Sequence, residues 1–140
     1  MNNAILVQNF IEQIWNQREF EKLENFLHPD FHDYGLPPIF PPNQEGTKKW
    51  ILNTGASFEH NTIIEEQVTE DDKSILKIRM NLKHIGVWRN IQPTGIDLHA
   101  VGYRYFKLND GKIIEHWALI DGQAIETQLN NVIKGCKIAE

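Results

Sequence analysis

The order of two hydrophobic patterns along the chain constrains its fold more than any other feature. Up to about residue 58, apolar side chains recur at the spacing of amphipathic helices. After residue 62 they alternate with polar side chains, as in half-buried strands. Helices followed by antiparallel strands, without β–α–β alternation, are typical of the α+β class. We therefore expect a curved antiparallel sheet wrapped around the N-terminal helices, forming a cone with a pocket.

Three helices are expected in the first part of the chain. The first ends near Gln17, and its apolar stripe consists of Val7, Phe10, Ile11, Ile14 and Trp15. The second ends before Pro29, because a residue that precedes proline disfavours the α conformation; its apolar residues are Phe20, Leu23, Phe26 and Leu27. The third spans Thr47 to about Phe58. Residues 34–46, rich in proline and glycine, are expected to form a long surface loop, and such loops often serve as lids.

Four strands are expected after the helices, over residues 62–69, 74–88, 97–108 and 112–119. In the second of these, one parity is apolar or inward-facing and comprises Leu76, Ile78, Met80, Leu82, His84, Gly86 and Trp88. The Asp110–Gly111 pair between the last two strands predicts a hairpin. A short helix over residues 122–129 is expected to close the domain.

Size and composition indicate one domain over residues 1–140, since no repeat or linker divides the chain. The net charge of −5 comes from scattered residues, and no basic stripe is present that would favour nucleic-acid binding. Neither a signal-peptide pattern nor a membrane-spanning apolar run is seen, so we expect a cytoplasmic protein without a membrane partner. The single cysteine, Cys136, excludes an internal disulfide and is interpreted as incidental.

Two polar residues are candidates for acid/base chemistry. His84 shares a strand face with apolar residues, which fits either a core histidine bound to a backbone carbonyl or a pocket-lining group. Period two places Asp121 on the side of Trp117 and Leu119, unless a bulge intervenes. Partial desolvation there would raise the pKa of its carboxyl toward the working pH. The alternative for Asp121 is the N-cap of the helix that begins at Gly122, and the two roles are compatible.

Other residues admit two interpretations. The group His28, Asp30, His32 and Asp33 fits a zinc or iron site, but a solvated helix end accounts for the same residues, and no metal is expected. Aromatic residues would either line a cavity or fill the core. The sequence has none of the common hydrolase, nucleotide or zinc motifs, so any catalysis is expected to be proton transfer without a cofactor.

A series of motifs resembles the SnoaL-like polyketide cyclase family, whose members have the nuclear-transport-factor-2-like α+β barrel, a cone-shaped fold. The motifs occur in the family's order and are His84-Ile85-Gly86, Gln92-Pro93-Thr94-Gly95, Asp110-Gly111-Lys112-Ile113, Glu115-His116-Trp117 with Asp121, and Gln128-Leu129. Residues 46–50 and 56–58 are also similar to the family's third helix and the turn that follows it.

The resemblance implies an intramolecular aldol condensation on a polyketide ester, or a related isomerase or lyase step, without metal or organic cofactor. By position, Asp121 would be its general acid/base, and His84 the polar partner. The ligand would be a small hydrophobic or aromatic carbonyl compound, and the expected substrate-binding residues are Tyr34, Trp50, Trp88, His99, His116 and Trp117. The chain departs from the family at Asp30-Phe31-His32-Asp33-Tyr34, where members often have Asp-x-x-Asp-His, and at the bulky Val87-Trp88-Arg89-Asn90. Trp88 and Arg89 at the pocket mouth favour a smaller substrate than a tricyclic polyketide.

Three hypotheses follow for the function. The first is an enzyme that uses Asp121 for proton transfer. The second is a non-catalytic module that binds a small molecule in the same cavity, for which Asp121→Asn would leave affinity intact. The third, which is compatible with either, is a homodimer formed through the outer sheet face, as in relatives of this family, with Ile75 or Ile85 exposed on that surface.

Overall fold

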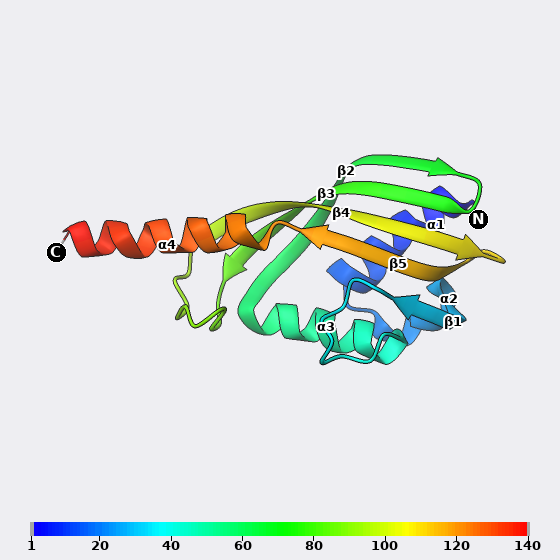
Figure 1. Cartoon of the computed structure of the whole chain (residues 1–140), viewed down its shortest axis with the longest axis horizontal. Helices are drawn as coiled ribbons and strands as arrows, with labels where there is room; N and C mark the ends of the chain where they lie inside the picture. Colours follow the sequence, from blue (N-terminus) through cyan, green and yellow to red (C-terminus); the bar gives the residue numbers. More distant parts are fainter. Residues whose placement is uncertain (1, 140) are drawn as a thin grey trace.

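The computed structural model describes the backbone of residues 2–139 and the side chains of residues 2–133, so the Cys136 side chain lies outside the described part. Figure 1 shows the first helix behind the sheet, the helix of residues 44–57 below it, and the last helix projecting from the end of the sheet. In chain order the elements are α1 (Asn3–Phe10), a π-helical segment (Ile11–Asn16), a 3-10 turn (Phe20–Lys22), α2 (Leu23–Phe26), β1 (Leu27–Asp33), α3 (Gln44–Ser57), β2 (Phe58–Glu70), β3 (Lys73–His84), β4 (Asp97–Asn109), β5 (Lys112–Ile120) and α4 (Gly122–Ala139).

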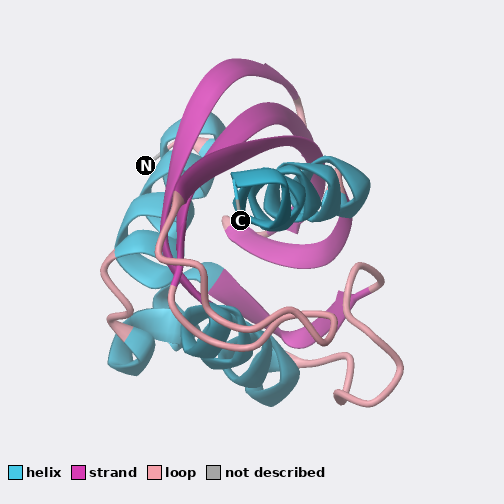
Figure 2. Cartoon of the chain, turned by 90° about the vertical axis from the view of Figure 1, so that its left-hand side faces the viewer, coloured by secondary structure: helices cyan, strands magenta, loops and turns pink. Residues whose placement is uncertain are grey.

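The five strands form one sheet in the order β1-β5-β4-β3-β2. The α+β class and the curved sheet are confirmed; in the end-on view of Figure 2 the strands form an arch, and α4 projects from its concave side. The four expected strands pair antiparallel. The fifth, β1, pairs parallel with β5 and was predicted as a helix end and loop. Pro29 is compatible with β1 because this is an edge strand, where a missing N–H is tolerated.

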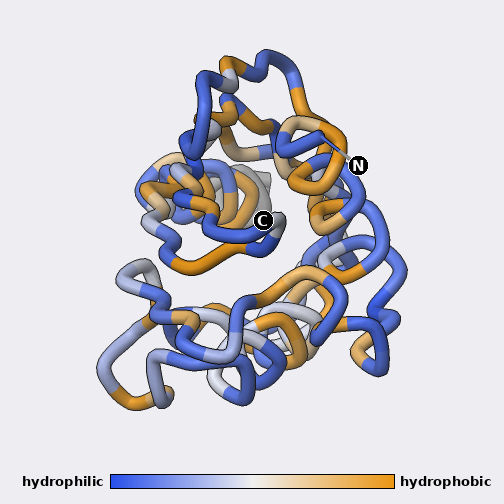
Figure 3. Tube along the Cα trace, turned by 90° about the vertical axis from the view of Figure 1, so that its right-hand side faces the viewer, coloured by the Kyte–Doolittle hydropathy of each residue, from blue (hydrophilic) through white to orange (hydrophobic). Residues whose placement is uncertain are grey.

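The core lies between the concave sheet face and the helices. In β3 the predicted alternation is confirmed, since Leu76, Ile78, Met80, Leu82 and His84 are all buried. Ile14 and Val7 from the first helix and Ile51 from α3 are completely buried against this layer. Along these helices and strands, hydrophobic stretches alternate with hydrophilic ones (Figure 3).

The first helix changes pitch at Ile11. It begins with the Asn2 side chain, which accepts a hydrogen bond from the Ile5 amide at 2.8 Å. Residues Ile11–Asn16 then take π-helical geometry and bury Ile11, Ile14 and Trp15. Wider turns of this kind often occur at functional sites. Here the segment delivers the Trp15 side chain to the interior.

A β-bulge in β5 reverses the predicted orientation of its second half. Leu108 pairs with Ile113 and Lys107 with Glu115, so Ile114 is an extra residue. An extra residue exchanges the two faces of every position that follows it. His116 is therefore buried, whereas Trp117 and Leu119 are exposed. The expectation that Trp117, Leu119 and Asp121 share the inner face was wrong for this reason.

The chain ends in a longer helix than expected. α4 extends over Gly122–Ala139, beyond the predicted end at residue 129. The Asp121 Oδ1 atom accepts a hydrogen bond from the Ala124 amide at 2.9 Å, which is the N-cap geometry. None of the helices within residues 2–139 has the length and apolar character needed to cross a bilayer.

Candidate functional site

Two adjoining cavities lie between the concave face of the sheet and the helices. The larger has a volume of about 280 Å³ and extends from Trp15 to Trp88 and the start of α4. The smaller has about 150 Å³ and extends toward β1. Both are lined by Trp15, Trp50, Arg104 and Ile120. These four side chains therefore form the boundary at which one cavity continues into the other.

Three neighbouring strands bring a buried group of polar side chains to the smaller cavity. Asp33 ends β1, His116 lies on β5 and Arg104 on β4, and all three line this cavity. The Nδ1 atom of His116 lies 2.9 Å from Oδ1 of Asp33. Its Nε2 atom lies 3.3 Å from Nη1 of Arg104. We refer to these three residues as the Asp33–His116–Arg104 group.

The hydrogen-bond partners determine where the imidazole proton sits. Since arginine can only donate, Nη1 of Arg104 donates to Nε2 of His116. Nε2 therefore carries no proton, and Nδ1–H donates to the carboxylate of Asp33. The result is a neutral imidazole between an anion and a cation. Its unprotonated nitrogen is on the Arg104 side.

The pKa shifts agree with this charge state. Burial alone would raise the pKa of Asp33, but hydrogen bonds from His116 and from the Gly35 amide, with the Arg104 charge, hold it below its ordinary value. Burial lowers the pKa of His116 and outweighs its hydrogen bond to Asp33. Burial also lowers the pKa of Arg104 to about 10, against the opposing effect of Asp33. At neutral pH the group holds one carboxylate, one neutral imidazole and one guanidinium.

Surrounding contacts fix this group in place. The Arg104 guanidinium carbon lies 4.3 Å from the Trp15 ring centre, a cation–π contact. The Asp33 Oδ1 atom accepts the Gly35 amide at 2.8 Å, and Oδ2 lies 3.5 Å from the Thr47 hydroxyl of α3. The Nε atom of Arg104 is buried and has no hydrogen-bond partner among the described residues. A buried guanidinium with a free donor is suited to receive an oxygen of a ligand.

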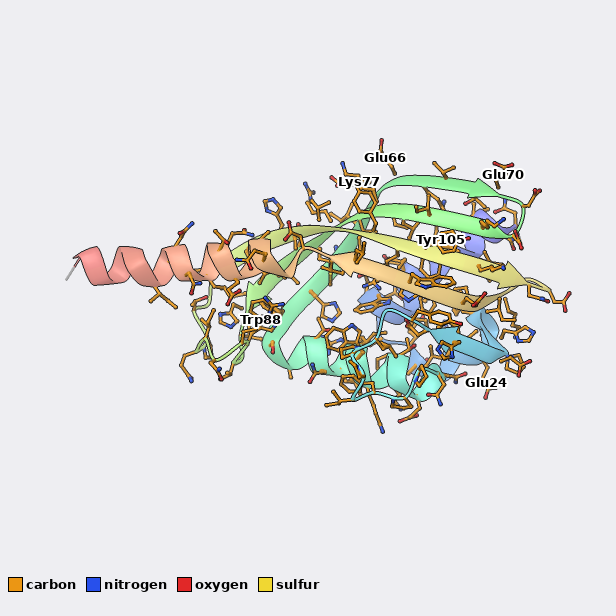
Figure 4. All side chains as sticks on the ribbon, in the orientation of Figure 1. Glu24, Glu66, Glu70, Lys77, Trp88 and Tyr105 are labelled. Carbon is orange, nitrogen blue, oxygen red and sulfur yellow. The ribbon has the colours of Figure 1, made fainter. Side chains whose placement is uncertain are left out.

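Three of the predicted site residues line the cavities. Trp50 contributes to both, Trp88 to the larger and His116 to the smaller. Trp88 is labelled in Figure 4, near the end of α3. His116 was expected only as a substrate-binding residue, and the structure places it at the centre of the polar group.

Four other predicted residues lie elsewhere. Asp121 is exposed and caps α4. Tyr34 and Trp117 stack on each other at 4.6 Å between ring centres, and both are exposed. His99 lines a shallow groove across β2–β4 with a volume of about 510 Å³. This groove is larger than either interior cavity, but none of Asp33, His116 and Arg104 lines it.

His84 is a buried residue behind the larger cavity. Its Nδ1 atom accepts the Thr94 amide at 3.1 Å and lies 3.0 Å from the Thr94 hydroxyl. The proton is therefore on Nε2, which has no partner among the described residues. His84 does not belong to the lining of either cavity. Its bonds connect β3 to the segment before β4, and its catalytic role, like that of Asp121, stays a prediction.

Sequence reasoning missed Arg104 and Trp15 and considered Asp33 only as a metal ligand. One signal was available for Arg104, because it shares strand parity with the buried Ala100, Phe106 and Leu108. A charge at an inward position of a strand indicates a function or a partner. Among the described side chains, no three His, Cys, Asp or Glu residues converge as metal ligands would. Asp33 is committed to His116 instead.

A family model described as SnoaL-like polyketide cyclase matches residues 5–129. The chain belongs to the SnoaL-like polyketide cyclase family. No curated protein matches it significantly. The SnoaL-like family assignment covers both cavities and the whole Asp33–His116–Arg104 group, because all the residues that line them fall within the matched range.

Solved structures share the fold of this SnoaL-like chain. IdmH from Streptomyces antibioticus superposes with a TM-score of 0.83 at 20% identity, over 93% of this chain and 99% of IdmH. TsrD from Streptomyces laurentii superposes with a TM-score of 0.79 at 20% identity, over 92% of this chain and 97% of TsrD. A SnoaL-like polyketide cyclase from Agrobacterium tumefaciens superposes with a TM-score of 0.78 at 15% identity, over 92% of this chain and 98% of that protein. At these identities the likeness concerns the fold alone.

Proposed function

We propose that this SnoaL-like protein binds a small, largely apolar carbonyl compound in the paired cavities and catalyses proton transfer at the carbon next to the carbonyl. The observation that supports this most is the neutral His116, held by Asp33 and adjacent to the Arg104 guanidinium at the junction of the cavities. The reaction class is an enolisation that leads to aldol ring closure, isomerisation or elimination. No cofactor is part of the proposal.

Each member of the group has one task in this reaction. Nε2 of His116 removes the α-proton, and the carboxylate of Asp33 stabilises the imidazolium that forms. Arg104 donates a hydrogen bond to the carbonyl oxygen, where negative charge develops as the enolate forms. Its donor is the Nε–H, which has no partner among the described residues, and the long 3.3 Å contact from Nη1 opens so that Nε2 of His116 can take the proton. Return of the proton from His116 to the product restores the starting state.

The environment supports this chemistry. Trp15, Trp50, Trp88 and Phe58 give the cavities apolar walls. In such surroundings a fixed charge stabilises a developing anion more than it would in water. The depressed pKa of His116 keeps its nitrogen available as a base at neutral pH.

The test is exchange of the α-protons of 4-phenylbutan-2-one for deuterium, followed by NMR in D₂O. His116→Gln is expected to slow the protein-dependent exchange by at least about 100-fold, since a positioned base contributes that much or more. Asp121→Asn is the matched comparison, because asparagine also caps a helix. We expect Asp121→Asn to keep most of the activity.

Two outcomes would contradict the proposal in different ways. If Asp121→Asn abolished exchange while His116→Gln did not, the acid/base role predicted for Asp121 would be correct instead. If the ketone bound, as read from tryptophan fluorescence, but no variant and not even the natural sequence accelerated exchange, the non-catalytic binding module would be favoured.

The homodimer is proposed on a separate feature, the outer face of the sheet. Ile75 pairs with Tyr105, and Tyr105 with Trp117, so these side chains form one row across β3, β4 and β5. Tyr103 and Leu119, a neighbouring cross-strand pair, are 50% and 80% exposed. In Figure 4, Lys77 and Glu66 lie on the side of the sheet away from the helices. An apolar row of this size on a sheet surface favours a second copy of the chain as its partner.

A further inference from the structure

We infer that Arg89 is a specificity residue that binds a carboxylate on the ligand, so that the ligand is an apolar oxo acid and not a neutral ketone or ester. The inference rests on the proposed function, because it assumes that the larger cavity holds the ligand. Arg89 lines this cavity where it meets Gly122, the first residue of α4.

The backbone around Arg89 is strained in a way that positions this side chain. Trp88 and Ile91 exchange two backbone hydrogen bonds, of 3.0 and 2.8 Å, around a turn formed by Arg89 and Asn90. Both turn residues have positive φ, 46° and 64°. Glycine or asparagine is preferred at such positions, and a long side chain there costs free energy. Strain of this kind at a cavity points to a function for the residue that carries it.

Two further contacts aim the guanidinium. Its carbon lies 4.5 Å from the Trp88 ring centre, so the indole supports it from one side. On the other side it lies against Gly122, where a Cβ atom would come within 2.7 Å of Nη2. Glycine at position 122 therefore leaves the space that the guanidinium occupies. These contacts hold the Arg89 side chain in place although about half of its surface is exposed, which leaves its guanidinium accessible to a ligand.

The charge of the cavity favours an anion. Its described lining contains two guanidinium groups, Arg89 and Arg104, and no carboxylate. The charge of Arg104 is balanced by Asp33. Among the described residues, the one ion-pair partner of Arg89 is Glu126, which does not line the cavity and lies at 3.4 Å. This pair is partly exposed, with 49% and 33% of the two side chains accessible, and such pairs are weak. A ligand carboxylate can therefore replace Glu126 at little cost.

In this arrangement the two arginines bind opposite ends of one ligand. Arg104 meets the carbonyl oxygen at the deep end, and Arg89 meets a carboxylate at the mouth. The apolar walls between them suit an aromatic or aliphatic spacer. Arginine suits the carboxylate because its planar fork can form two parallel hydrogen bonds.

The test compares 4-oxo-4-phenylbutanoate with its neutral isostere 4-oxo-4-phenylbutanamide, by isothermal titration calorimetry. We expect the acid to bind at least about ten-fold more tightly than the amide, the size of one charge-assisted hydrogen bond. Arg89→Gln should remove this preference by weakening binding of the acid about ten-fold or more, with a much smaller change for the amide. Lys83→Gln, an exposed residue of β3, is the control for the same change in net charge.

Glu126→Gln distinguishes ligand recognition by Arg89 from a purely structural role, in which the Arg89–Glu126 ion pair only connects the turn to α4. If Arg89 binds the ligand, removing the competing carboxylate of Glu126 should increase the affinity for the acid and leave the affinity for the amide unchanged. If the ion pair has only a structural role, Arg89→Gln and Glu126→Gln should lower the affinity for both ligands equally. That result would overturn the inference. Equal affinity of acid and amide for the natural sequence would overturn it too, while the proposed function stands. If neither compound bound, the proposed function would fail and the inference with it.

Discussion

At the scale of single residues, the site depends on the order of charges along Asp33, His116 and Arg104. A buried arginine or a buried aspartate alone would be costly, because each needs a partner to offset the loss of hydration. The neutral imidazole connects the two by one hydrogen bond on each side. Removing any one member therefore leaves a buried charge or a buried polar atom without its partner.

Asp33→Asn tests this dependence. The substitution leaves the Arg104 cation buried without an anion, so we expect the free energy of unfolding to fall by about 3 kcal/mol. Asp30→Asn is the matched control on the same strand, because Asp30 is exposed, and it should change stability by less than about 0.5 kcal/mol. Urea unfolding of both variants measures the difference. Similar stabilities for the two would show that the charges of the group are not coupled.

The residues of the site were only partly predictable. Trp50, Trp88 and His116, which the family resemblance implied as substrate-binding residues, line the cavities. Arg104 was recognisable from strand parity. The contact of Asp33 with His116 was not, because it joins residues 83 positions apart through a parallel strand pair. No local pattern encodes such a pair.

At the scale of the elements, the β-bulge at Ile114 decides which side chains reach the cavity. Without it, strict alternation from Ile113 would place Trp117 inside and His116 outside. Bulges depend on how two strands pair and leave little trace in a single strand. The lengths of β2, β3, β4 and β5 were predicted to within a few residues, but the face of β5 could not be.

The junction of β5 and α4 gives a prediction for Asp121. Because its carboxylate caps α4, we expect Asp121→Ala to lower the free energy of unfolding by about 1 kcal/mol, whereas Asp121→Asn should stay close to the natural sequence. Chemical denaturation followed by circular dichroism measures both. Equal loss in the two variants would mean that the charge of Asp121, and not its cap, is what the structure needs.

At the scale of the whole molecule, the order of helices and strands was enough to predict the fold, because few arrangements cover one face of such a sheet. The parallel edge strand β1 was missed since its seven residues include a proline and lack alternation. It nevertheless carries Asp33, so the part of the fold that was hardest to predict supplies an essential member of the site.

Two histidines with lowered pKa values, the buried His116 and the half-buried His60, should make the whole fold sensitive to mild acid. Burial, with the charges of Arg18 and Arg104, lowers the pKa of His60 from 6.5 to about 4, and burial lowers that of His116 as well. Below about pH 6.5 the unfolded chain takes up protons that the folded chain does not, so stability must fall from pH 6.5 toward 4.

His60→Leu is the variant that tests this pH dependence. Neither ring nitrogen of His60 has a partner among the described residues, so leucine should also raise stability at neutral pH, by about 1 kcal/mol. Urea midpoints at several pH values give both quantities. An unchanged slope in His60→Leu would assign the acid sensitivity to other groups.

The outer sheet face gives a prediction about assembly. Leu119→Lys places a charge beside the apolar row and should convert the proposed dimer to a monomer, as measured by sedimentation velocity. Leu52→Lys is the matched control, because Leu52 is an exposed leucine of α3, away from the sheet. A natural sequence that sediments as a monomer at high concentration would contradict the dimer without affecting the cavity.

The charge state of His116 is the most direct test of the proposed site, and ¹⁵N NMR of the histidine rings measures it. We predict a neutral ring at neutral pH, with the proton on Nδ1 and an unprotonated Nε2 whose signal shifts when 4-oxo-4-phenylbutanoate binds. A ring that is protonated at neutral pH, or whose Nε2 signal does not respond to this ligand, would contradict the assignment of His116 as the base.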